Sequence, residues 1–223
     1  MHYLYAIDIT QRDCPHIAVS KNIRGLRVFV LGGNPSGSRM EMVSLFASNR
    51  DGTVDEALRF ISEQDHVGDL DVLVKKGNAA ICRYSIARTE ALHTLMNYGQ
   101  RLYPFIASNG IERWMFISDE PHLERKVHDT EMTKITGIRR LSSEEFLDLY
   151  LYTQVQVWKA HRYSGDGFEG YRLIAESVAL GYFDWPRRVS LSEMSKRLNV
   201  PRTTLTYRIR KAERDVLNDI LDL

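Results

Sequence analysis

The stretch from Gly181 to Glu213 constrains this chain most, because its apolar residues follow two helical repeats separated by a short break. Ser190 with Glu193 three residues later is a capping-box pattern, which indicates the start of a helix. Apolar residues spaced by three and four follow it, and Asn199-Val200-Pro201 interrupts them. Because proline suits the first turn of a helix, a second helix is expected directly after this break.

The second helix separates apolar residues from polar and basic ones. Its apolar side consists of Leu205, Ile209, Ala212 and Val216. The opposite side carries hydroxyl, phenol and guanidinium groups, which can contact base edges and phosphates. Recognition helices contact bases through their N-terminal part, so the base-contact candidates are Thr203, Thr204, Thr206, Tyr207 and Arg210. The phosphate-contact candidates are Arg187, Arg188, Arg202, Arg208, Lys211 and Arg214.

Charge is concentrated in the same region. Between Arg187 and Arg214 there are nine basic residues and two acidic ones, whereas the whole chain has a formal net charge of +1. A local basic excess on a nearly neutral protein indicates a surface for a polyanion. The pattern leaves one alternative open, an amphipathic helical hairpin with a solvated charged face.

The phrases GYFDWPRR, SLSEMSKRL, RTTL and RKAER resemble the C-terminal helix-turn-helix domain of archaeal bacterio-opsin activator-type regulators. The resemblance covers roughly residues 166–215. It implies a sequence-specific transcription regulator that binds double-stranded DNA and carries a variable N-terminal sensory or partner-binding domain. The N-terminal two-thirds carries no comparable match, so the effector, a possible small molecule, stays unknown.

Helix-turn-helix regulators usually pair their heads about one helical turn apart on DNA, so a homodimer is expected. The last helix carries more apolar residues than a small core needs, and the candidates for a dimer seam are Val216, Leu217, Ile220 and Leu221. The aromatic residues of Tyr182–Trp185 precede the helix-turn-helix unit. We therefore expect them to pack in the core rather than to stack on bases.

The N-terminal part alternates strand and helix signals. From Met40 to Ala107 the order is strand–helix–strand–strand–helix–strand, which is ferredoxin-like, with helices on one face of the sheet. Extra strands at 3–9, 26–31 and 113–118 would extend the sheet. We therefore predict an α+β chain with a ferredoxin-like α/β sandwich over residues 1–163 and a trihelical helix-turn-helix domain over 164–223.

Two cysteines, Cys14 and Cys82, fit a reducing cytoplasm with free thiols. Cys14 and His16 could contribute to a metal site, but the sequence offers no convincing second pair of ligands, so a buried or free thiol is favoured. A redox- or metal-sensing thiol, with its pKa lowered by Arg12, is the alternative. The Gly32–Gly37 stretch is expected to be a hairpin loop, since no phosphate-loop context follows it.

No catalytic constellation, cofactor motif or run of about 18 apolar residues is evident. We therefore expect a cytoplasmic regulator without catalytic residues, metal or cofactor, and no membrane partner. Two other functions stay open. One is a small-molecule-binding or enzymatic N-terminal module with a protein-interaction tail, and the other is an architectural DNA binder that tolerates any sequence.

Overall fold

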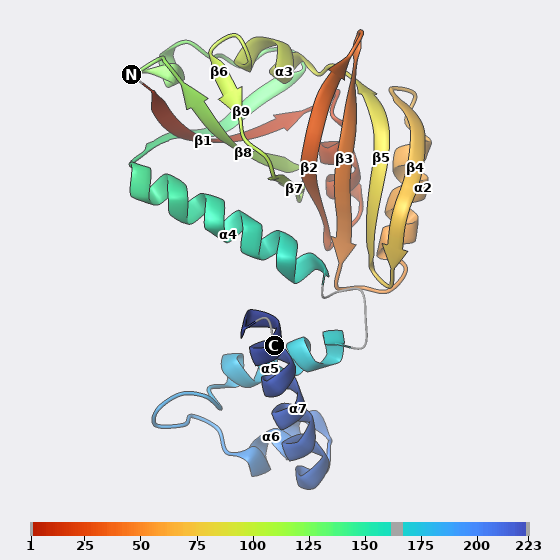
Figure 1. Ribbon diagram of the computed structural model, residues 1–223, viewed down its shortest axis with the longest axis vertical. Coiled ribbons are helices and arrows are strands. Elements are labelled where there is room, and N and C mark those ends of the chain that lie inside the picture. Colours follow the sequence, from red (N-terminus) through yellow and green to blue (C-terminus); the bar gives the residue numbers. More distant parts are fainter. Residues whose placement is uncertain (1, 162–166, 222–223) are drawn as a thin grey trace. The chain divides into compact units, whose positions relative to one another are not determined.

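The computed structural model describes residues 2–161 and 167–221 (Figure 1). Contacts divide the chain into two compact units, Met1–Tyr163 and Ser164–Leu223. The first is a mixed α+β unit built on an antiparallel sheet, and the second is helical. The predicted α+β class is confirmed at this level, and each unit is described by itself below.

The sheet of the first unit has nine strands among the described residues, in the order β4-β5-β3-β2-β7-β8-β1-β9, with β6 paired to β8 beside this path. The strands are β1 (Tyr3–Gln11), β2 (Leu26–Ser36), β3 (Arg39–Ser48), β4 (Val67–Lys76), β5 (Ala79–Ala87), β6 (Gly99–Arg101), β7 (Phe105–Ser108), β8 (Ile111–Ser118) and β9 (Thr133–Leu141). Every pairing among these strands is antiparallel. The pairs β2–β3, β4–β5 and β7–β8 are neighbours in the chain, whereas β1–β8, β1–β9 and β2–β7 join distant segments.

The ferredoxin-like prediction accounts for only part of this sheet. β3, the helix α2 (Thr53–Ser62), β4 and β5 form the expected split unit, because β5 lies between β3 and β4. The remaining place beside β3 is occupied by β2 and not by a strand from residues 102–107. The reason is the long β2–β3 hairpin, which pairs Leu26 with Ser48 at one end and Ser36 with Arg39 at the other.

One face of the sheet carries the main core. The helices α1 (Pro15–Asn22), α2 and α3 (Glu90–Leu95) and the short 3-10 turn η1 (Leu123–Arg125) pack against this face. Its largest fully buried side chains include Trp114, Tyr5, Tyr84 and Phe46. Alternate residues of β1 and β8 face this core, as the two-residue period of a strand requires.

The helix α4 (Ser143–His161) lies against the opposite face, which corrects the prediction that helices cover one face only. Its first half packs with Met115 and Leu141, and its second half packs with Phe29 and Leu45. It begins at a reciprocal cap in which the Ser142 N–H donates to Glu145 (2.8 Å) and the Glu145 N–H donates to Ser142 Oγ (3.1 Å). Residues 153–158 belong to the second half of α4.

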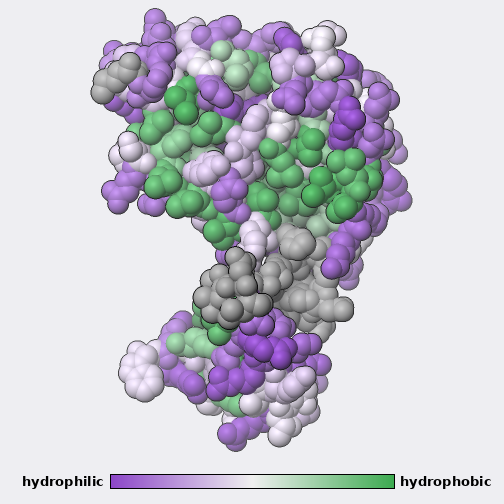
Figure 2. Space-filling model, viewed as in Figure 1, coloured by the Kyte–Doolittle hydropathy of each residue, from purple (hydrophilic) through white to green (hydrophobic). Residues whose placement is uncertain are grey.

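The outer side of α4 carries exposed apolar side chains. Leu147, Leu151 and Val155 are spaced by one turn each, and Tyr152 lies beside them. Figure 2 shows apolar side chains gathered over α4 and over the neighbouring strands of the sheet. We call the four residues of α4 the α4 stripe.

Local details of the first unit differ from the sequence analysis. The predicted hairpin at residues 32–37 exists, but residues 32–36 continue β2 and the turn lies at Gly37, whose φ of +57° favours glycine. Cys14 is the N-cap of α1 and His16 lies in its first turn, although this helix has no side-chain cap. The strand β9 was not predicted.

Three helices form the second unit: α5 (Gly167–Leu180), α6 (Leu191–Leu198) and α7 (Arg202–Leu221). Its core consists of the buried Val189, Met194, Leu205 and Ile209, with partly buried apolar residues of α5, α6 and the two connecting segments around them. Gly181 follows α5 with a φ of +81°, and the Tyr182 N–H donates to the Ser177 carbonyl (2.9 Å). This glycine stop turns the chain out of α5 toward α6.

Candidate nucleic-acid interface

The predicted capping box at the start of α6 is confirmed. The Ser190 N–H donates to Glu193 Oε2 (2.7 Å), and the Glu193 N–H donates to Ser190 Oγ (3.2 Å). The bond from the Ser190 N–H and, second, a bond from the Ser190 hydroxyl to Glu193 Oε2 (2.8 Å) hold the pKa of the Glu193 carboxyl below its ordinary value. The cap therefore fixes where α6 begins by satisfying free N–H groups of its first turn.

The turn between α6 and α7 is equally well defined. Asn199 has a φ of +51°, a left-handed conformation that asparagine tolerates better than most residues. The Val200 N–H donates to the Ser195 carbonyl (3.1 Å), and Ser195 Oγ donates to the Val200 carbonyl (2.6 Å). The Pro201 carbonyl then accepts from the Leu205 N–H (2.8 Å), which starts α7. The result is a tight helix–turn–helix.

The inner side of α7 is buried and its outer side is open. Leu205, Ile209 and Ala212 are buried, and all five base-contact candidates are exposed. Tyr207 is 68 % exposed, and the side chain of Arg210 is 79 % exposed. The helical repeat thus directs one set of residues into the core and the other set to the surface.

Two of these candidates already have partners within α7. The Thr206 hydroxyl donates to the Arg202 carbonyl (2.8 Å), so its oxygen is left to accept hydrogen bonds and its methyl group to make apolar contacts. Arg210 Nη1 donates to Glu213 Oε2 (2.9 Å), and the two residues lie about one helical turn apart. An exposed ion pair of this kind contributes little energy, so Arg210 can exchange Glu213 for another acceptor at low cost.

The phosphate-contact candidates surround α7 and the start of α6. All six are exposed, namely Arg187, Arg188, Arg202, Arg208, Lys211 and Arg214. The Arg187 guanidinium lies 4.6 Å from the Tyr182 ring centre, Arg188 pairs with Asp184, and Arg214 pairs with Asp215 at 3.2 Å. Within the described part of the chain, Arg202, Arg208 and Lys211 form no ion pair.

The aromatic segment before α6 differs from the prediction. Tyr182 packs on the core as expected, and its ring contacts Phe183 edge to face. Phe183 is exposed, however, and Trp185 is 98 % exposed. The prediction that these aromatics are packing residues is therefore wrong for Trp185. Hydrophobicity does not distinguish these rings, because the path of the segment between Gly181 and Ser190 decides which of them reaches the core.

The predicted dimer seam at the end of α7 is described only in part. Leu217 is 54 % exposed. The side chains of Val216, Ile220 and Leu221 lie outside the described residues. The seam therefore stays a prediction.

Two features of the first unit could hold a ligand. A hollow of about 610 Å³ lies between α1 and the start of β9, with Arg12, Lys21 and Lys134 among its lining residues. Separately, Cys14, His16 and Glu112 bring three metal-binding atoms within 4.8 Å of one another, all buried. Sequence reasoning missed Glu112, which is distant in the chain. Burial raises the pKa of the Cys14 thiol well above its ordinary value, which corrects the suggestion that Arg12 lowers it.

Two family models match this chain. Residues 170–218 match HTH_10, described as an HTH DNA binding domain, of the bacterio-opsin activator type. The protein is thus a DNA-binding transcription regulator of the helix-turn-helix class, and its second unit binds double-stranded DNA. Residues 4–136, more than half of the chain, match a model named HVO_2525_N and described as N-terminal, and the chain belongs to that family.

No curated protein matches the chain. Among the described residues, no helix combines the length and the apolar composition needed to cross a bilayer.

Replacing Ser190 with alanine should loosen the start of α6. The loss of its cap should lower the local free energy of opening by about 0.5–2 kcal/mol, measured by amide hydrogen exchange in α6 and α7. Ser192→Ala, an exposed change on the same helix, is the control and should leave exchange unchanged. Equal protection in both variants would contradict the capping role.

The stability that Glu193 contributes to the start of α6 should depend on pH. Because the folded-state pKa of Glu193 is lowered from 4.5, its contribution to stability is present above that value. It is lost as the pH falls through the lowered pKa. The difference in protection between the wild type and Glu193→Gln should therefore shrink as the pH drops below 4.5.

Proposed function

We propose that this regulator binds specific double-stranded DNA sequences with residues 202–214 of α7 in the major groove. The observation that carries the proposal is the outer side of α7, which presents exposed hydroxyl, phenol and guanidinium groups while its inner side holds the core. Docking a helix in this way places its N-terminal residues against base edges. Thr203, Thr204, Thr206, Tyr207 and Arg210 are the proposed base contacts.

The basic residues around α7 supply the electrostatic part of binding. Arg187, Arg188, Arg202, Arg208, Lys211 and Arg214 are the proposed phosphate contacts. Such contacts set the position of the protein on the duplex but do not by themselves select a sequence.

We propose that the first unit receives the signal or pairs two copies of the chain. The hollow lined by Arg12, Lys21 and Lys134 has a volume in the range of small-molecule sites and supports the first role. The α4 stripe, with its four exposed apolar side chains, supports the second role. A DNA-binding domain indicates a regulator rather than an enzyme, and we assign no catalytic residue to the first unit.

Selection of bound sequences from random duplexes tests this function directly. The full-length protein should enrich a palindromic consensus whose half-sites are about one helical turn, roughly 10 base pairs, apart. Enrichment without a consensus would indicate an architectural binder. Failure to retain any duplex would favour a protein-interaction role for the second unit.

Arg210→Ala should weaken binding to the selected operator by roughly 1–3 kcal/mol and relax the preference at one base position. Lys211→Ala should weaken operator and random duplexes alike, and should reduce the slope of log K against log salt by about 0.9. Both effects are measured by fluorescence anisotropy over a series of salt concentrations.

The matched control for these two variants is Arg83→Ala, an exposed arginine of β5 paired with Glu41. It should leave affinity and salt slope unchanged. Glu213→Ala, which removes the partner of Arg210, should not weaken binding. Unchanged operator affinity of Arg210→Ala would remove Arg210 from the base contacts.

Trp185 is a further candidate for contact with DNA. It is almost fully exposed, beside Arg187 and Arg188, whereas Trp114 is fully buried. The fluorescence of Trp185 should therefore change when the operator is added. Trp185→Phe should lose most of that change, because the other two tryptophans, Trp114 in β8 and Trp158 in α4, belong to the first unit. An identical titration signal in both proteins would place Trp185 away from the duplex.

Leu151→Glu and Leu217→Glu test the two proposed dimer surfaces. A charge in an apolar seam should convert a dimer to a monomer in analytical ultracentrifugation, because the buried carboxylate has no partner. Leu73→Glu, at an equally exposed leucine of β4, is the control and should remain dimeric. If both test variants stay dimeric, neither the α4 stripe nor the end of α7 is the seam.

A further inference from the structure

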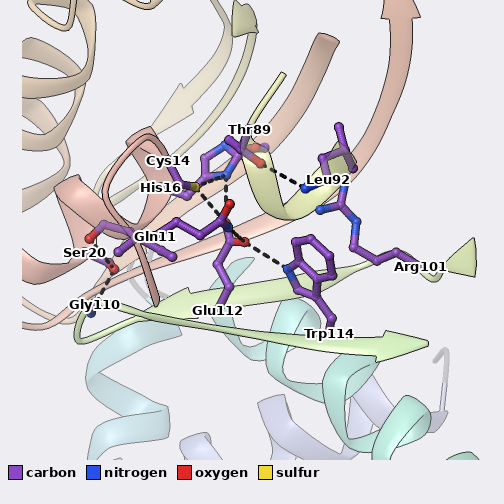
Figure 3. A network of polar contacts seen from close by, with 12 residues as sticks. Gln11, Cys14, His16, Ser20, Thr89, Leu92, Arg101, Gly110, Glu112 and Trp114 are labelled. Atoms are coloured by element: carbon purple, nitrogen blue, oxygen red, sulfur yellow. Dashed lines mark hydrogen bonds and ion pairs between the residues drawn. The ribbon is translucent and has the colours of Figure 1, made fainter. Parts of the chain in front are cut away.

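The end of β1 and the start of α1 meet β8 inside the first unit, and three chemically distinct side chains converge there (Figure 3). Cys14 is the N-cap of α1, and His16 lies in its first turn. Cys14 Sγ is 3.1 Å from Glu112 Oε1, His16 Nδ1 is 3.1 Å from the same oxygen, and Sγ is 3.7 Å from Nδ1. All three residues are at most 2 % exposed.

The size of this triangle fits a metal ion. Zinc binds sulfur at about 2.3 Å, nitrogen at about 2.0–2.1 Å and carboxylate oxygen at about 2.0–2.2 Å. At a tetrahedral angle these lengths separate the donor atoms by about 3.3–3.6 Å. The separations of 3.1, 3.1 and 3.7 Å are therefore within a few tenths of an ångström of those around a bound ion.

Two of the three side chains, His16 and Glu112, are also held in place by residues outside the cluster. His16 Nε2 is 2.6 Å from the Tyr84 hydroxyl, which in turn is 2.7 Å from Ser44 Oγ. Glu112 Oε2 accepts from Trp114 Nε1 (2.9 Å) and from Gln11 Nε2 (3.3 Å). The outer atoms are thus occupied, and Nδ1 and Oε1 face Cys14. Metal ligands are commonly oriented by outer partners in this way.

Beside the triangle lies a small cavity of about 10 Å³, lined by Gln11, Arg101, Glu112 and the two other members of the cluster. Two buried polar atoms on these lining residues lack a hydrogen-bond partner, the acceptor Gln11 Oε1 and the donor Arg101 Nε. Buried polar atoms are rarely left unsatisfied. A volume of this size admits about one water molecule, and a water or hydroxide on an ion could satisfy both atoms.

Charge balance is compatible with an ion at this place. A thiolate and a carboxylate offset a divalent cation, and the remaining positive group is Arg101. Its guanidinium lies 4.2 Å from the Phe105 ring centre and 4.4 Å from the Trp114 ring centre, where the ring faces stabilise a cation. A hydroxide in the open position would offset it further.

Without an ion the cluster is a hydrogen-bonded network. Burial raises the pKa of the Glu112 carboxyl, but the His16 hydrogen bond and the charges of His16 and Arg101 outweigh burial and lower it overall. Burial and, to a smaller extent, the Glu112 charge raise the pKa of the Cys14 thiol, and Cys14 Sγ donates to Glu112 Oε1. Binding an ion would release the thiol proton and form a sulfur–metal bond.

We propose that Cys14, His16 and Glu112 bind one divalent transition-metal ion, with the fourth position open to the small cavity. Sulfur, imidazole and carboxylate together suit zinc or cobalt better than magnesium or calcium, which prefer oxygen ligands alone. Three protein ligands with one open position differ from a closed structural zinc site. The proposal concerns the first unit alone and does not depend on which DNA sequence the second unit binds.

Cobalt titration of the full-length protein, after removal of metals with a chelator, tests this site. One equivalent of Co²⁺ should bind and produce a near-ultraviolet thiolate-to-cobalt charge-transfer band, which one equivalent of Zn²⁺ should abolish. Cys14→Ser should lose the band, whereas Cys82→Ser, the matched change at the other buried cysteine, should keep it. Circular dichroism of each variant verifies that it is folded.

Two further variants keep the test decisive if Cys14→Ser does not fold. Glu112→Gln should weaken Co²⁺ binding while keeping the thiolate band at saturation. Tyr84→Phe, which removes the hydroxyl beside His16 Nε2, should weaken binding by roughly 10–100-fold, because Tyr84 is a positioning residue. Absence of stoichiometric Co²⁺ and Zn²⁺ binding by the folded wild type overturns the proposal, as does a charge-transfer band that follows Cys82.

Discussion

The burial of one side of α7 is the constraint on which the DNA-binding unit depends. Leu205 and Ile209 each contribute roughly 1.5–3 kcal/mol by leaving water, and in a unit of this size few other side chains contribute as much. Because a helix has one fixed repeat, holding this side against α5 and α6 also fixes which residues face outward. The exposed positions of Tyr207 and Arg210 are therefore a consequence of core packing. The cap at Ser190 sets the direction in which α6 begins, and the turn at Asn199 sets the direction in which α7 begins.

In the first unit the comparable constraint is the pairing of β1 with β8. The register places Ile9 opposite Glu112, close to the point where the chain leaves β1 for α1. This pairing brings a carboxylate from β8 beside Cys14 and His16, although 96 residues separate Glu112 from His16. The arrangement sits between the sheet and α1, where the surrounding apolar core excludes water. A buried acid in that position needs partners, and His16, Trp114 and Gln11 provide them.

The success of prediction differed between the two units for a physical reason. In the second unit the signals are local, since the capping box, the helix break and the apolar spacing each lie within a few residues of the element they define. In the first unit, local signals predicted the order of β3, α2, β4 and β5, with β5 between β3 and β4. They did not predict which strands the others pair with. The β2–β3 hairpin took the place expected for a later strand, and β9 joined β1 without a clear alternation to announce it.

The sequence by itself determined the helix–turn–helix, the polar outer side of its last helix and the concentration of basic residues around it, because helical periodicity and charge are properties of neighbouring residues. The tertiary structure alone decided that Trp185 is exposed, that α4 covers the second face of the sheet and that Glu112 joins Cys14 and His16. Each of these features depends on which strands pair or on the path that a loop takes. Contacts between residues so far apart in the chain produce no periodic pattern in the sequence.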